Sequence, residues 1–136
     1  MSFLSKLFNF NKSAVGRSYR SAVNSVDRQK ILDRWKVIEE LKITGKPSAF
    51  KEAVIEADKL VDFALSCIYP SVGVSVERLK QAKELFISDK QDYENLWYAH
   101  KIRNELVHKV GFDLPSIEAK NILDYFKKAL EIIGGL

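Results

Sequence analysis

The sequence contains few of the residues that interrupt helices or form cross-links. Its 136 residues include one cysteine, three prolines and six glycines, which argues against a disulfide scaffold and against the frequent turns of a β-sandwich. No run of 18 uninterrupted apolar residues occurs, so no membrane-spanning helix is expected. With 46% hydrophobic and 29% charged side chains, the chain is suited to one globular helical domain.

The single cysteine, Cys67, lies in an apolar helical stretch and has no partner for an intramolecular disulfide. We expect it to be buried as a small hydrophobic side chain, which fits a reducing compartment. Residues 1–10 lack the charged start, sustained apolar run and small-residue cleavage site of a secretory signal. The expected location is therefore the cytoplasm.

Acidic residues are missing from the first 26 positions, which contain Lys6, Lys12, Arg17 and Arg20. From Asp27 onward 18 basic residues balance 18 acidic ones, so the whole net charge of +4 lies in the N-terminal arm. Such an arm is able to contact nucleic acid phosphates or an anionic membrane surface. The alternative is a solvated, loose chain end.

Apolar residues within this arm recur on one face of a predicted short amphipathic helix, which would dock residues 3–10 on the body, a partner or a lipid surface. These residues are Phe3, Leu4, Leu7 and Phe8. We therefore divide the chain into a basic amphipathic arm, residues 1–25, and a helical domain, residues 26–136.

Apolar spacings of three and four residues predict five helices in this domain. Ser48 is a predicted N-cap, and Gly111 and Gly134 are predicted to end the last two helices. The apolar faces are predicted to include Val110 and Ile117. Short loops imply antiparallel neighbours, so the expected fold is all-α, a compact antiparallel bundle of four to five helices. The predicted ranges are about 26–43, 49–68, 75–87, 93–110 and 115–133.

Both histidines of the chain lie on the fourth predicted helix. His100, Asn104 and His108 are four residues apart and therefore share one face, and Arg103 adjoins them. Histidine transfers protons near neutral pH, and a guanidinium binds phosphate oxygens through paired hydrogen bonds. Such a set is suited to phosphoryl transfer. With RNA as substrate, the 2′-hydroxyl would attack, histidine would accept its proton, and arginine would stabilise the charge on the phosphate oxygens.

The run Arg103-Asn-Glu-Leu-Val-His108 resembles the Arg-x4-6-His signature of the HEPN superfamily, including the polar residue that often follows the arginine. The resemblance covers about residues 26–133. It implies a HEPN-like helical bundle and a metal-independent endoribonuclease without a cofactor, which produces a 2′,3′-cyclic phosphate. It also implies that the arginines and histidines of two protomers meet at a homodimer interface. The implied catalytic residues are Arg103, Asn104 and His108.

Other HEPN members bind nucleotides or RNA without cutting, or act as protein-interaction modules in toxin–antitoxin or defence systems. The charge balance of residues 27–136 favours such a non-catalytic module, because an RNA enzyme usually carries a basic footprint on its body. In a purely structural alternative, Arg103 pairs with a nearby carboxylate such as Glu105 or Asp113, and His108 caps or packs near the helix end beside Gly111. A buried, ion-paired Arg103 would count against catalysis.

Several other residues are candidates for accessory roles. His100 is an alternative second proton-handling group, although about 12 Å of helix axis separates it from His108. Glu56 or Asp58 would orient an imidazole, with a solvated helix face as the alternative reading. The aromatic residues Tyr93, Trp97 and Tyr98 are candidates for base stacking or for ordinary packing.

No metal site is expected, because the two histidines are too far apart along one helix to chelate one ion. Neither a Cys-x-x-Cys nor a His-Glu-x-x-His arrangement occurs, and no glycine-rich loop is placed to bind a triphosphate. The expected partners are RNA or a nucleotide and a second copy of the chain, with an antitoxin or other protein, or a membrane surface at residues 3–10, as further candidates.

Overall fold

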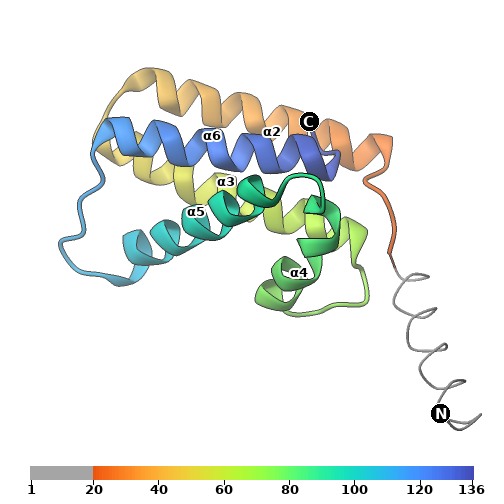
Figure 1. Ribbon diagram of the computed structural model, residues 1–136. Helices are drawn as coiled ribbons and strands as arrows, with labels where there is room; N and C mark the ends of the chain where they lie inside the picture. The colour runs from red at the N-terminus through yellow and green to blue at the C-terminus, as the bar shows by residue number, and fades with distance from the viewer. Residues whose placement is uncertain (1–19) are drawn as a thin grey trace, which may run out of the picture.

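The computed structural model describes residues 20–136, and within this range the protein is an all-α bundle, as predicted (Figure 1). The central helix is α3, which contacts α2, α4, α5 and α6. The expected amphipathic helix at residues 3–10, and Lys6, Lys12 and Arg17 with it, lies outside the described residues. The elements are α2 (Ser25–Thr44), α3 (Pro47–Ile68), α4 (Ser75–Gln81), the 3-10 helix η1 (Ala82–Phe86), α5 (Lys90–His108) and α6 (Ser116–Ile133).

Local chemistry sets both ends of α2 and the C-terminal end of α6. The Asn24 side chain accepts a hydrogen bond from the backbone N–H of Asp27 at 2.8 Å, which satisfies one donor in the first turn of α2. At the other end, Gly45 has φ of 71°, a left-handed conformation that glycine adopts without strain. Gly134 ends α6 in the same way, as predicted, with φ of 96°.

Other predicted boundaries were wrong. Ser48 is not the N-cap of α3, because Lys46 occupies that position and Pro47 is the first helical residue, where a proline loses no hydrogen bond. The third predicted helix divides at Ala82 into α4 and a 3-10 turn. The fourth begins before residue 93, at Lys90, and ends at His108.

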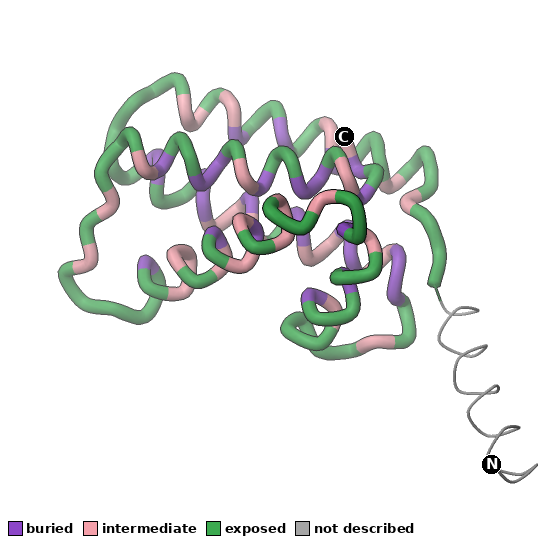
Figure 2. The backbone as a smooth tube through the Cα atoms, in the orientation of Figure 1, coloured by how far each residue is buried: buried purple, intermediate pink, exposed green. Residues whose placement is uncertain are grey.

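The core forms where α2, α5 and α6 pack around α3, and the buried segments face inward in Figure 2. Its largest fully buried side chains include Tyr69, Phe86 and Phe126. Two residues predicted to face inward do not: Val110 is 101% exposed because the chain has already left α5, and Ile117 is 74% exposed in the first turn of α6. No helix within residues 20–136 is long and apolar enough to cross a membrane.

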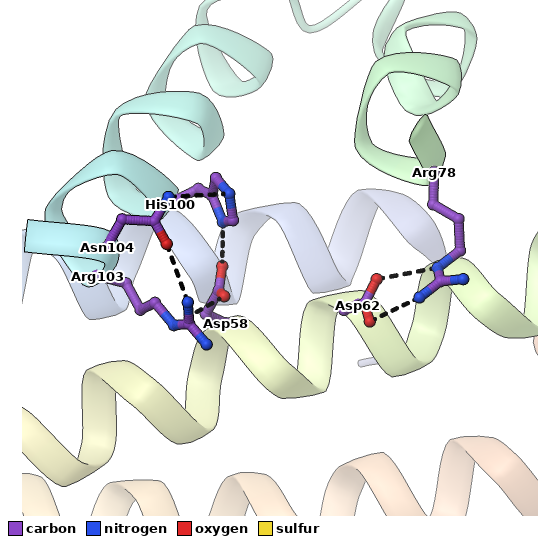
Figure 3. Close-up of polar contacts among 6 residues, drawn as sticks. All are labelled: Asp58, Asp62, Arg78, His100, Arg103 and Asn104. Atoms are coloured by element: carbon purple, nitrogen blue, oxygen red, sulfur yellow. Dashed lines mark hydrogen bonds and ion pairs between the residues drawn. The ribbon is translucent and has the colours of Figure 1, made fainter. Parts of the chain in front are cut away.

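A bidentate ion pair attaches α4 to α3 (Figure 3). Arg78 donates from Nε and Nη2 to the two carboxylate oxygens of Asp62 at 3.0 and 2.9 Å, and from Nη1 to the Val72 carbonyl at 2.6 Å. The hydrogen bonds to Asp62 raise the pKa of Arg78 above its ordinary value. This pair fixes the turn that leads from α3 into α4.

Two isoleucines of α6, one buried and one exposed, provide a matched test of the packing. Ile122→Val removes one methylene from a fully buried site, so the free energy of unfolding should fall by about 0.5–1.5 kcal/mol in urea denaturation. Ile117→Val makes the same chemical change at an exposed site and should shift it by less than about 0.5 kcal/mol. Equal losses in the two variants would contradict the packing described.

Candidate functional site

Part of the polar stripe predicted on α5 forms a hydrogen-bonded cluster with α3 (Figure 3). His100 Nδ1 lies 2.8 Å from Asp58 Oδ1, and Arg103 Nε lies 3.3 Å from Asp58 Oδ2. Arg103 Nη1 donates to Asn104 Oδ1 at 2.9 Å, and Asn104 Nδ2 lies 3.4 Å from His100 Nε2. The four residues, Asp58, His100, Arg103 and Asn104, form a closed ring of contacts, which we call the α3–α5 polar cluster.

Helical spacing brings the three α5 side chains of the cluster together. Arg103 and Asn104 follow His100 by three and four residues, so all three side chains leave α5 on the side that faces α3. Ala57 and Ala99, the sequence neighbours of Asp58 and His100, are fully buried in the core. The cluster therefore lies at the rim of the core, where side-chain exposure is 14% for Asp58, 20% for His100 and 24% for Arg103.

The contacts define which ring nitrogen carries the proton when the His100 imidazole is uncharged. An ionised Asp58 only accepts hydrogen bonds, so His100 Nδ1 carries the proton that points to it. His100 Nε2 is then an acceptor for the Asn104 amide, whose oxygen accepts from Arg103. Asp58 thus orients the imidazole of His100, one of the roles predicted for this residue.

Arg103 is only partly satisfied by the cluster. Its Nε lies 3.3 Å from Asp58 but is buried without an aligned hydrogen bond, so this contact is an ion pair of imperfect geometry. Its Nη1 bonds to Asn104, and Nη2 has no hydrogen-bond partner within residues 20–136. One edge of the guanidinium can therefore accept an anion without breaking the bond to Asn104.

His108 does not belong to the cluster. It is the last residue of α5, its side chain is exposed, and it makes no hydrogen bond to residues 20–136. The structure therefore unites Arg103 and Asn104 with His100 and leaves His108 about 7.5 Å further along the axis than Arg103. Arg103 does pair with a carboxylate, as in the structural alternative, but the partner is Asp58 and not Glu105 or Asp113.

The remaining predicted contact residues lie elsewhere. Glu56 accepts a hydrogen bond from Arg34 of α2 at 2.7 Å, and this bond, with Lys59 3.6 Å away, lowers the pKa of the Glu56 carboxyl. Glu56 therefore has a separate ion-pair network and does not orient the imidazole. Arg20, the one arm cation that the structure describes, lies 3.4 Å from Glu84.

A small cavity borders the cluster between α3, α4 and α5. Asp58, Asp62, Ser75 and His100 contribute its polar lining. Its volume of about 20 Å³ is enough for roughly one water molecule and too small for a nucleotide. No group of three or more His, Cys, Asp or Glu side chains within residues 20–136 is arranged to hold a metal ion. A phosphate ligand would have to approach Arg103 from solvent.

Asp58→Asn tests whether the carboxylate holds the cluster together. Two neighbours, His100 and Arg103, lose their charged acceptor, so the free energy of unfolding should fall by about 1–3 kcal/mol in urea denaturation at pH 7. Asp124→Asn is the matched control, because Asp124 is exposed and lies 3.9 Å from Lys42; its effect should stay below about 0.5 kcal/mol. Two equal effects would show that Asp58 is not a structural centre.

The functional assignment depends mainly on the geometry of the site, because comparison with known proteins gives no match. The resemblance to the HEPN superfamily depends on the run from Arg103 to His108 within an all-α domain. No family model, curated protein or solved structure matches the chain.

Proposed function

We propose that this protein is a HEPN-like, metal-independent endoribonuclease whose active site is completed in a homodimer. One observation carries the proposal: α5 ends in an exposed histidine, His108, five residues after an arginine that a hydrogen bond to Asn104 holds in a defined orientation. Phosphodiester transfer needs a cation for the phosphate oxygens and a group that moves protons, and the exposed end of α5 carries one of each, separated by about 7.5 Å along the helix axis.

The proposed reaction uses the 2′-hydroxyl of the substrate as its own nucleophile. His108 removes the proton from O2′, O2′ attacks the adjacent phosphorus, and the bond from phosphorus to O5′ breaks. The products are a 2′,3′-cyclic phosphate and a 5′-hydroxyl, for which the leaving O5′ takes up a proton. Arg103 stabilises the charge that grows on the non-bridging oxygens, and Asn104 holds Arg103 in place.

The requirement for two protomers follows from the number of accessible histidines. The reaction needs one group that accepts a proton and one that gives a proton. Both ring nitrogens of His100 already face Asp58 and Asn104, so His108 is the histidine of each chain that can meet a substrate without disrupting the cluster. In a two-fold dimer, His108 of the partner subunit would protonate O5′.

A non-catalytic nucleotide-binding, RNA-binding or protein-interaction module of the same superfamily is the second candidate. The specific observation in its favour is the ion pair of Arg103 with Asp58, together with the 24% exposure of the Arg103 side chain. An arginine whose charge is already partly neutralised binds phosphate less strongly. This candidate predicts saturable binding that Arg103→Ala abolishes, and no strand cleavage.

Cleavage of mixed RNA in EDTA by the purified full chain separates the two candidates. Wild-type protein should produce 2′,3′-cyclic phosphate ends, and His108→Ala should lower kcat/KM at least about 100-fold because the exposed proton-handling group is lost. Arg103→Ala should have a comparable effect. Lys109→Ala, the exposed neighbour of His108, should cleave at the wild-type rate.

Folding controls keep this experiment interpretable. Arg103→Lys retains a cation opposite Asp58 but loses the planar guanidinium, so it should fold like the wild type and still cleave poorly. Unchanged cleavage in a folded His108 or Arg103 variant would refute the proposed mechanism. RNA that remains intact with the wild-type protein would favour the binding module.

An active site shared by two protomers should make the activity depend on protein concentration. Because one protomer supplies only one accessible histidine, activity per protomer should rise with protein concentration and level off when the dimer is saturated. Sedimentation equilibrium gives the dimer fraction at each concentration for comparison. Constant activity per protomer across the dissociation range would show that one chain suffices.

A further inference from the structure

An open groove with a volume of about 650 Å³ lies between α5 and the segment formed by α4 and η1. Its lining combines three lysines with three aromatic residues. They are Lys80, Lys83 and Lys101, and Tyr93, Trp97 and Tyr98. This size is in the range of ligand sites, unlike the cavity of about 20 Å³ beside His100.

The groove is locally basic although residues 27–136 as a whole are balanced in charge. Glu94 is the one acidic residue in its lining. A neighbouring hollow shares Lys83, Tyr93 and Glu94 and adds a further lysine, Lys90. Lys80 lies 3.4 Å from Glu77, but both side chains are more than half exposed, so this pair screens the lysine only weakly. The lysines therefore form a cationic surface along the groove.

A series of rings connects the groove to the α3–α5 polar cluster. The ring centres of Phe86 and Tyr93 are 5.4 Å apart, those of Tyr93 and Trp97 are 6.4 Å apart, and those of Trp97 and His100 are 6.0 Å apart. The Tyr93 hydroxyl donates to the Leu79 carbonyl at 2.9 Å, which fixes that ring against α4. Trp97 thus belongs to a rigid series that ends at the cluster.

We infer that this groove binds single-stranded RNA, with phosphates on Lys80, Lys83 and Lys101 and a base stacked on Trp97. Aromatic rings interleaved with cations are suited to single strands, because every unpaired base has a face to stack and every linkage has a phosphate. A duplex keeps its bases stacked internally and cannot use the ring. The inference rests on the proposed function, whose substrate it narrows to unpaired RNA.

Binding is measured with the full chain and a fluorescent 2′-O-methyl RNA 12-mer, which has no 2′-hydroxyl to attack. Replacing Lys80, Lys83 and Lys101 together by Gln should weaken binding at least about tenfold. The plot of log association constant against log salt concentration should also become less steep, with a slope smaller in magnitude by about 2. The matched control replaces three exposed lysines of α6 by Gln, which removes the same charge and should have a much smaller effect. These control residues are Lys120, Lys127 and Lys128.

Tryptophan fluorescence reports on stacking, because the chain has only two tryptophans. Trp35 is 7% exposed and donates to Glu39, whereas Trp97 lines the groove. The 12-mer should quench wild-type fluorescence, Trp97→Phe should lose most of the quenching, and Trp35→Phe should keep it. A duplex of the same sequence should quench and bind less than the single strand.

Equal loss of affinity in the two lysine variants, or quenching that persists in Trp97→Phe, would overturn the groove as the binding site. Circular dichroism confirms that each variant is folded. If wild-type protein cleaves RNA but groove variants bind normally, the groove inference fails and the nuclease stands. If binding depends on the groove but no RNA is cleaved, the nuclease fails and the groove stands.

Discussion

The burial of α3 against four other helices is the constraint on which the rest of the structure depends. Its apolar face supplies ten buried residues, and alanines at positions 53, 57 and 64 are fully buried, which lets neighbouring backbones come close. Hydrophobic burial has no preferred direction, so it drives the bundle together without selecting one orientation of each helix. Polar contacts at the rim of α3 supply that selection, and they are also where the candidate site lies.

Two aspartates one helical turn apart on α3 each hold a different neighbour. Asp62 fixes α4 through the bidentate pair with Arg78, and Asp58 fixes α5 through His100 and Arg103 (Figure 3). The first pair has the better geometry, because both nitrogens that face Asp62 make aligned hydrogen bonds. The second leaves Arg103 Nε buried without such a bond. An arginine held less completely by its structural partner retains capacity for a ligand, which is the property that the proposed phosphate contact requires.

The helix α5 contributes to both the candidate site and the lysine-lined groove, through different faces. Along α5, the residues facing α3 are tied into a network, whereas Trp97 and Lys101 line an open surface and His108 reaches solvent at the end. One helix thus presents a rigid polar face and an accessible basic and aromatic face. Binding strength would then come from the groove, and chemistry from the end of the helix, so the two can be altered separately by mutation.

The sequence by itself determined the presence and order of the four long helices, because apolar spacing is local and glycines such as Gly45 and Gly134 end helices by their own backbone freedom. It also placed His100 and Asn104 on one stripe with His108, and Arg103 next to that stripe. It did not reveal that α5 ends before Val110 or that Ile117 faces solvent, because both depend on how the connection after α5 leaves the bundle. Only the tertiary structure decided that Asp58, rather than Glu56, Glu105 or Asp113, meets His100 and Arg103. Asp58 and His100 are 42 residues apart, and their contact is set by the packing of α3 on α5, which no local spacing encodes.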